Sequence, residues 1–409
     1  MLLTSTGQLI FVRWCSRIQA ESQGGGPVIF SPIRLINRGS LALTLLVVSS
    51  RAIAGTPSFM GLGQPAGETL AHFTVNGVSA DGSTVVGTYN IAGALSPFRW
   101  TSATGVVALQ DPTVGPNNPE AYAASADGSV IVGCSRASEA VVWTTSGDMF
   151  SIGDLPGGAV AACANDVSHN GSTIVGASIG TNGPEAFVWT EATGMVGLGD
   201  LPGGFTSSGA NGVSGDGNTI VGLGYSGFKY PEAFRWTEAS GMVGLGDLPG
   251  GDTVSYAEAV SADGTAVVGI SGSASGRESG FIWTEAEGMI PLGDLPGGEY
   301  ESHGLAVSGD GSIVVGRSAV EGSTIAAFIW DRTNGIRHLQ EALVSDYGLD
   351  LSGWYLTVAT GITPDGMTIV GQGRAPSGRT EGWIAHIPEP SSVSLLMLVV
   401  CSWLCRRAR

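Results

Sequence analysis

The sequence contains few basic residues and little charge of either sign. Of its 409 residues, 18 are Lys or Arg and 35 are Asp or Glu, and Lys229 is the single lysine. Residues 55–387 keep 10 of the basic residues and 33 of the acidic ones, so that this segment has a formal charge of about −23. Binding to nucleic acid requires clustered Lys and Arg. The composition therefore excludes nucleic acid as a partner and predicts an acidic surface.

Residue patterns for metal or nucleophilic chemistry are also scarce. The sequence has five histidines, no His-Glu-x-x-His motif and no Cys-x-x-Cys motif. One Gly-x-Ser-x-Gly match, Gly176–Gly180, is followed by Asn182-Gly-Pro184, where a nucleophile elbow requires a helix. Its Ser178 has counterparts in other parts of the chain, at Ser135, Ser271 and Ser318. We therefore predict no catalytic residue, no metal centre and no cofactor, and leave weak Ca²⁺ binding by loop carboxylates open.

Cysteine is concentrated at the chain ends. Cys15, Cys401 and Cys405 fall in terminal segments, which leaves Cys134 and Cys163 in the central part. In an oxidising compartment this pair can form a disulfide. The alternative is two buried thiols, because the sequence does not give the separation of the two residues.

Glycine is abundant, with 65 residues, and much of it belongs to a repeat. The hexapeptide Gly-Asp-Leu-Pro-Gly-Gly begins at Gly153, Gly199, Gly246 and Gly293, each time ten residues after a tryptophan. Two further markers occur seven times each. The first is an Asp-Gly or Asn-Gly turn before a β-branched pair, at Asp81, Asp127, Asn170, Asp216, Asp263, Asp310 and Asp365. The second is a strand ending in Trp100, Trp143, Trp189, Trp236, Trp283, Trp330 and Trp383.

The repeat predicts an all-β fold, a seven-bladed β-propeller. Asp-Gly turns between apolar runs are typical of hairpins, and alternating apolar residues indicate strands. Four short strands in about 47 residues match one propeller blade. The seventh unit lacks a fourth strand after Trp383, whereas Ser58–Pro65 resembles such a strand and has no unit ahead of it. We therefore predict that the N-terminal and C-terminal strands share a closing blade, with the tryptophans packed between blades.

Residues 1–54 do not match the repeat and resemble an export signal. Arg34 and Arg38 precede an apolar run, Leu41–Val48, and Ala52 and Ala54 provide a small-x-small cleavage site. We predict an N-terminal extension with a secretory signal peptide over 1–54 and a propeller domain over 55–387.

The C-terminal residues 388–409 have a three-part order. Pro388, Glu389 and Pro390 are followed by an apolar stretch, Val393–Leu404, and then by Arg406, Arg407 and Arg409. This order resembles the PEP-CTERM sorting tail of Gram-negative bacteria. The resemblance implies processing by an exosortase-type membrane enzyme in an exopolysaccharide-producing cell. Twelve helical residues span only ~18 Å of a ~30 Å hydrocarbon core, so we expect transient membrane association rather than a permanent anchor.

The central repeats have a resemblance of their own. The sequences Ala-Phe-Arg-Trp-Thr-Glu and Gly-Met-Val-Gly-Leu-Gly-Asp-Leu-Pro-Gly-Gly, at 233–238 and 241–251, are similar to the HAF family of extracellular repeats. The similarity covers roughly residues 57–386. It implies secretion to the cell envelope or the extracellular space and implies no particular reaction.

Two groups of residues are candidates for a site. The acids of the hexapeptide, at Asp154, Asp200, Asp247 and Asp294, are one position repeated, so we interpret them as scaffold rather than as a catalytic pair. The stretch from Arg337 to Thr363 is longer than its counterparts and contains Tyr347, Trp354 and Tyr355. Long aromatic loops often bind ligands, so this stretch is a candidate ligand loop; the alternative is a packed connector.

The sequence thus predicts a secreted or surface-associated, non-enzymatic propeller with a structural, adhesive or carbohydrate-matrix-binding role. Its expected partners are the processing enzyme and an extracellular polysaccharide. The alternative is a propeller enzyme that acts on carbohydrate through carboxylates in the central channel.

Overall fold

The computed structural model describes residues 56–64, 72–91, 94–113, 115, 118–227, 230–251, 254–298, 301–321 and 324–388. The predicted signal peptide with Ala52 and Ala54, most of the predicted sorting tail (Glu389 and Pro390) and the basic cluster Arg406, Arg407 and Arg409 lie outside the described residues.

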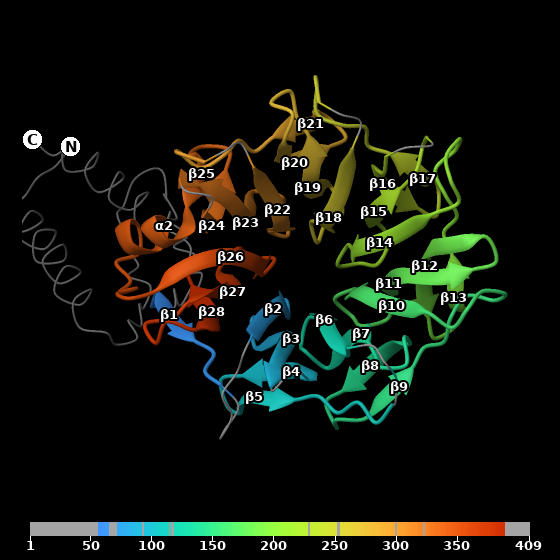
Figure 1. The fold of residues 1–409 in the computed structure, drawn as a ribbon, viewed down its shortest axis with the longest axis horizontal. Helices are drawn as coiled ribbons and strands as arrows, with labels where there is room; N and C mark the ends of the chain where they lie inside the picture. The colour runs from blue at the N-terminus through green and yellow to red at the C-terminus, as the bar shows by residue number, and fades with distance from the viewer. Residues whose placement is uncertain are drawn as a thin grey trace, which may run out of the picture. The chain divides into compact units, whose positions relative to one another are not determined.

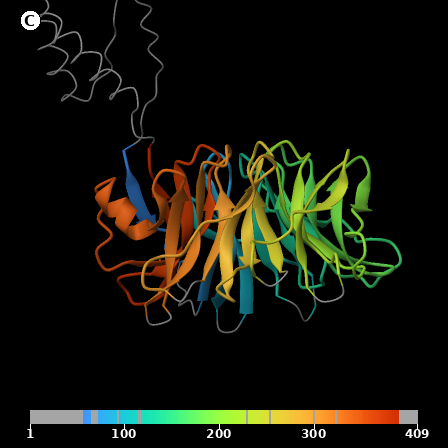
Figure 2. The same cartoon turned by 90° about the horizontal axis from the view of Figure 1, so that it is seen from above.

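The described residues form seven four-stranded antiparallel sheets arranged around a centre (Figure 1). This arrangement confirms the predicted seven-bladed β-propeller. Seen from the side, the strands run between the two faces of the ring (Figure 2). In each sheet the strands follow one another in sequence order, except in the blade that contains both ends of the propeller.

The first three blades, in chain order, have these strands. Blade 1 consists of β2 (His72–Val78), β3 (Thr84–Ile91), β4 (Ala94–Thr101) and β5 (Gly105–Ala108). Blade 2 consists of β6 (Glu120–Ala124), β7 (Val130–Cys134), β8 (Ala140–Thr144) and β9 (Met149–Ser151). Blade 3 consists of β10 (Ala162–Val167), β11 (Ile174–Gly180), β12 (Gly183–Thr190) and β13 (Gly194–Gly197).

The next three blades follow the same plan. Blade 4 consists of β14 (Ser208–Val213), β15 (Ile220–Gly224), β16 (Glu232–Thr237) and β17 (Gly241–Gly244). Blade 5 consists of β18 (Ser255–Val260), β19 (Ala266–Gly272), β20 (Glu278–Thr284) and β21 (Gly288–Pro291). Blade 6 consists of β22 (Ser302–Val307), β23 (Ile313–Val320), β24 (Thr324–Asp331) and β25 (Gly335–His338), and the helix α2 (Leu339–Ser345) follows it.

Blade 7 is shared between the two ends of the propeller, as the sequence predicts. Its strands are β26 (Tyr355–Ile362), β27 (Thr368–Arg374), β28 (Thr380–His386) and, at the outer edge, β1 (Ser58–Gly61). β1 pairs antiparallel with β28 from Ser58 opposite His386 to Gly61 opposite Trp383. Next to β1, the Gly63 N–H donates to Glu381 Oε1 at 3.1 Å. Gly199 and Gly246 make the same bond to Glu185 and Glu232, so the N-terminal segment takes the place of a fourth strand.

The Asp-Gly turn joins the first two strands of each blade through a small network of hydrogen bonds. In blade 1 the Ser79 hydroxyl donates to Asp81 Oδ1 at 2.6 Å, and the Ser83 N–H donates to the same oxygen at 2.9 Å. Gly82 has a φ of 71°, which favours glycine. The same network recurs at Asp127, Asp216, Asp263 and Asp310. These acids therefore have a local structural role.

The core between blades is built on phenylalanine more than on tryptophan. One Phe in each of five third strands has no exposed surface, at Phe98, Phe187, Phe234, Phe281 and Phe328. The ring lies against a glycine of the neighbouring strand, and a Cβ at Gly316 would stand 2.9 Å from Phe328 Cε1. Trp143 and Trp383 are fully buried, and Trp100 and Trp330 nearly so.

The other three tryptophans correct the expectation that all seven are core. Trp189, Trp236 and Trp283 are only half-buried at the edge of their clusters. On β16, Trp236 pairs with Met242 and Phe234 with Gly244 of the outermost strand, but only Phe234 is a buried member of the inter-blade cluster. The structure thus encloses Phe in the core and leaves Trp partly exposed at the edge of the cluster.

We expect Phe234→Ala to lower the free energy of unfolding by about 3–5 kcal/mol, because it leaves a cavity in a closed core. Trp236→Ala, which removes a larger side chain from a half-exposed position, should have a smaller effect. Urea-induced unfolding followed by circular dichroism measures both. An equal or larger loss for Trp236→Ala would contradict this assignment of the core.

Candidate ligand site in the central channel

The innermost strand of every blade contains a β-bulge, and the bulged residue lines the channel. The register between the first two strands shifts around one residue in blades 1 to 6 and around two, Thr357 and Thr360, in blade 7. One of these bulged residues from each blade lines a cavity of about 220 Å³: Asn76, Tyr122, Asn165, Asn211, Glu258, Leu305 and Thr360. A bulge leaves its extra residue outside the ladder and re-aims its side chain. The inner strands around this cavity surround the centre of Figure 1.

The repeats differ from one another at this ring. The residues beside the bulge are small or apolar in nearly every blade, whereas the bulged residue is an amide, a phenol, a carboxylate, an alkyl group or a hydroxyl. A set of unlike side chains around one cavity can recognise a ligand that a ring of identical residues could not orient. The channel is therefore the candidate functional site.

Three asparagines in the ring are held in one orientation. The Nδ2 atoms of Asn76, Asn165 and Asn211 donate to the backbone carbonyls of Ala121, Ala210 and Ala257, each in the next blade, at 2.8, 2.8 and 2.9 Å. A carbonyl accepts only from the amide nitrogen, which fixes the orientation of each side chain. One N–H of each amide therefore serves the blade-to-blade contact, and the second N–H and the oxygen Oδ1 remain for other partners.

Asp166 introduces a carboxylate where the other blades have Gly or Ala. Its Oδ1 accepts from the Val167 N–H and its Oδ2 from the Val213 N–H of the next blade, both at 2.8 Å. Loss of hydration in the channel wall raises the pKa of Asp166 to about 7, and the two backbone donors offset only part of that rise. The group is thus close to half-ionised near neutral pH.

Glu258 is the second channel carboxylate, two blades away. Burial raises the pKa of Glu258, and Arg317 on β23 of the next blade opposes this shift in part. His169 also lines the cavity, and burial lowers the pKa of its imidazole. At neutral pH this histidine adds no full positive charge to the cavity.

A polar cluster lies near Glu258 at the junction of blades 5 and 6. The His303 side chain is buried; its Nδ1 lies 3.3 Å from Arg317 Nη2, and its Nε2 lies 3.4 Å from Glu278 and 3.5 Å from Glu301. Burial, followed by the charge of Arg317, lowers the pKa of His303. Within the described ranges, no group of three or more His, Cys, Asp and Glu side chains is arranged to hold a metal ion.

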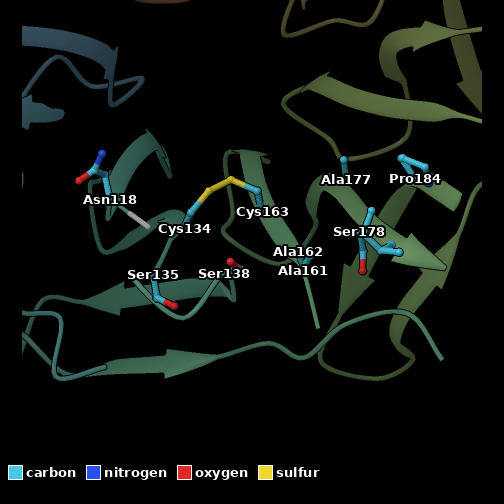
Figure 3. A pocket seen from close by; sticks show the side chains of 11 residues that line it. Asn118, Cys134, Ser135, Ser138, Ala161, Ala162, Cys163, Ala177, Ser178 and Pro184 are labelled. Atoms are coloured by element: carbon cyan, nitrogen blue, oxygen red, sulfur yellow. A yellow bond between two sulfur atoms is a disulfide. The ribbon is translucent and has the colours of Figure 1, made fainter. Parts of the chain in front are cut away.

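Cys134 and Cys163 form a disulfide, which decides between the two alternatives left by the sequence. The bond links β7 of blade 2 to β10 of blade 3, with the two Cα atoms 4.9 Å apart. It lies in the wall of a second cavity of about 360 Å³ with Ser135, Ser138 and Ser178 (Figure 3). A crosslink of this span stabilises a fold by roughly 3 kcal/mol through loss of unfolded-state entropy.

The Ser178 hydroxyl has a structural role. It accepts the Leu155 N–H of the hexapeptide loop at 3.0 Å, and Ser271 and Ser318 accept Leu248 and Leu295 in the same way. The leucine side chains are buried, so these bonds fix the loop on the next blade. The repeated serine is therefore occupied as scaffold.

The residues of the candidate ligand loop lie away from the channel cavity and pack on blade 7. Trp354 meets Phe59 edge-on with ring centroids 5.2 Å apart, and Tyr347 packs against the cluster that contains Leu343. Gln340 of α2 donates to the Trp354 carbonyl at 2.9 Å and accepts the Leu356 N–H at 3.0 Å. Tyr355 opens β26 and packs partly buried between blades 6 and 7. Much of the aromatic surface in this segment is engaged in these contacts.

Sequence reasoning did not identify the channel residues. The signal is an alignment of the repeats on the Ser or Thr before each Asp-Gly turn, in which the residue three positions earlier is the variable one. Nothing in the sequence indicated that this position carries a bulge. The variable residue was therefore indistinguishable from an ordinary strand residue.

No protein-family model and no curated protein matches this sequence. Among solved structures, an oligogalacturonate lyase from Vibrio parahaemolyticus superposes with a TM-score of 0.50 at 13% identity, over 82% of this chain and 98% of that one. An oligogalacturonate lyase in complex with manganese gives the same TM-score and identity over 82% and 97%. TolB from Acinetobacter baumannii gives a TM-score of 0.41 at 14% identity; 63% of this chain is covered, and it spans 60% of the TolB chain. At these identities the likeness shows the fold alone.

In the part of the chain that the structure describes, no helix is long and apolar enough to cross a membrane.

The raised pKa of Asp166 predicts that this residue makes a pH-dependent contribution to the free energy of unfolding. Because its pKa in the folded protein, about 7, exceeds the ordinary value of 3.8, the folded chain holds a proton that the unfolded chain has lost between these values. This contribution is therefore present at low pH and is lost as the pH rises to and beyond 7. Relative to Asp166→Asn, the wild type should lose stability between pH 4 and pH 8 in urea unfolding.

Asp127→Asn is the matched control. The Ser129 side chain and N–H hold the pKa of Asp127 below its ordinary value, so its contribution is constant above pH 5 and is lost only in acid. A difference between wild type and Asp166→Asn that stays flat from pH 4 to pH 8 would contradict the burial of this group.

Proposed function

We propose that the protein is a secreted or surface-associated, non-enzymatic binding propeller that recognises an extracellular polysaccharide in its central channel. The observation that carries this proposal is the ring of seven bulged residues, of five different kinds, around one cavity. Hydroxyl-rich ligands are recognised by a few placed amides, carboxylates and an aromatic group, and Asn165, Glu258 and Tyr122 supply one of each.

Delivery outside the cytoplasm is part of this proposal. It is supported by the signal-like segment 1–54, by the tail that resembles PEP-CTERM and by the Cys134–Cys163 disulfide, since disulfides persist in oxidising compartments. The expected processing partner is an exosortase-type membrane enzyme that acts at Pro388-Glu389-Pro390 in a Gram-negative-type cell.

The second candidate is a propeller enzyme acting on carbohydrate. Asp166 and Glu258 favour it, since two channel carboxylates with raised pKa values are the kind of groups that serve as acid and base. Against it, both Asp166 oxygens are engaged by backbone N–H groups. Release of reducing ends or of unsaturated products from a polysaccharide, lost in Glu258→Gln, would establish this alternative.

A glycan array tests the binding function. The ring closes within Ser58–His386, so residues 55–388 contain every strand of the propeller and can be used as the probe. We expect this domain to retain a defined set of glycans, and Tyr122→Ala to reduce retention because it removes the only aromatic side chain of the ring. Addition and removal of Ca²⁺ checks whether loop carboxylates contribute. Retention of no glycan under either condition would contradict the proposal.

Mass spectrometry of the extracellular protein tests delivery. We expect the mature protein to begin after Ala54 and to lack the residues after the Pro388-Glu389-Pro390 junction. Prolines on both sides of Glu389 keep this junction extended and accessible. Recovery of a C-terminal peptide that reaches Arg409 would favour a simple anchor.

A further inference from the structure

The channel cavity is rich in hydrogen-bond acceptors. Of the described residues that line it, none is Lys or Arg, whereas Asp166 and Glu258 both contribute carboxylates. The amide oxygens of Asn76, Asn165 and Asn211 add three more acceptors, because one N–H of each amide is bonded to the next blade and fixes the orientation of the side chain. A ligand with hydrogen-bond donors and a positive charge complements these groups.

Burial makes the two carboxylates costly to ionise, and their partners in the protein offset only part of this cost. Both lie recessed in the channel wall, where the loss of water disfavours the charged form. A bound cation would restore part of the lost solvation and favour ionisation. The cavity is thus arranged so that a cationic group gains from two carboxylates on separate blades.

The spacing of the acids favours an organic cation over a metal ion. Asp166 belongs to blade 3 and Glu258 to blade 5, and no three acidic, His or Cys side chains among the described residues are arranged to hold a metal ion. A metal ion binds ligands at about 2–2.5 Å and needs them to converge. An ammonium group on a larger body can meet one carboxylate while hydroxyls of the same body meet the amide oxygens.

The remaining members of the ring suit a sugar. Tyr122 offers an aromatic face, which attracts both a cation and the C–H face of a sugar ring. A cavity of about 220 Å³ lies below the ~300–1,000 Å³ of sites for drug-sized ligands, so it suits a single sugar residue.

We propose that the channel binds the protonated amine of an amino-sugar residue, as in a partially de-N-acetylated polysaccharide. Glu258 pairs with the ammonium group, and the oxygens of Asn165 and Asn211 accept from the sugar hydroxyls. This inference rests on the proposed function and names the class of glycan.

Isothermal titration of residues 55–388 with a glucosamine hexamer at pH 6 tests the inference, with the fully N-acetylated hexamer as the matched ligand. We expect the amine form to bind at least tenfold more tightly, and binding to weaken with added salt. Glu258→Gln should weaken binding of the amine form at least tenfold. Glu238→Gln makes the same change at an exposed turn and should have no effect.

A variant that binds more tightly separates the inference from misfolding, which could also explain weaker binding by Glu258→Gln. Leu305 is the one alkyl side chain in the ring, and Leu305→Glu adds a carboxylate from blade 6. We expect it to tighten binding of the amine form severalfold, whereas Leu305→Gln, of the same size, should not.

The outcomes separate this inference from the function on which it rests. Equal binding of both hexamers, or binding that Glu258→Gln leaves unchanged, overturns the amine inference and leaves carbohydrate binding in place. Titration with spermidine gives the third outcome. If no oligosaccharide binds, but spermidine binds and Glu258→Gln removes that binding, the carbohydrate function is overturned and an amine site in the channel is retained.

Discussion

Pairing between β1 and β28 joins the two ends of the propeller, and the geometry of the ring depends on it. The bonded residues Gly63 and Glu381 are 318 positions apart, so this contact closes almost the whole described chain into one loop. Without β1, β28 would be a free sheet edge, and Phe59 would leave its place between Trp354 and Trp383. Closure also forms the channel, since residues of all seven inner strands line the cavity.

The repeated packing residues and the candidate ligand-binding residues occupy different positions in each blade. The repeated features serve the packing between neighbouring blades, which is alike from one junction to the next. They are the buried Phe, the glycine that it contacts, the Ser that accepts from the hexapeptide leucine N–H, and the Asp-Gly turn. The bulge aims one residue away from that packing, so this position could diversify at little cost to the core. Glu258 at this position and Asp166 beside it are tolerated because each has polar compensation, from Arg317 for Glu258 and from two backbone donors for Asp166.

The sequence predicts the parts of the fold that depend on periodic signals. The count of seven follows from Asp-Gly turns and tryptophans, and the shared blade follows from the surplus strand at Ser58 and the deficit after Trp383. Burial within a blade was harder to predict: Phe234 and Trp236 share a strand face, and only the neighbouring glycines decide which ring is enclosed. The channel site could not be predicted, because a bulge depends on pairing with the second strand. The Arg337–Thr363 segment was ambiguous for the same reason, since Gln340 and Trp354 meet only in the folded chain.

Native-state hydrogen exchange on the chain without residues 57–64 tests most directly whether closure holds the propeller together. The intact chain and a chain without residues 1–54 are the controls. If closure is the organising contact, amides of β26, β27 and β28 and of the adjoining β2 should all lose protection when β1 is absent. Faster exchange confined to the outer edge of β28, with β26, β27 and β2 unchanged, would contradict this account.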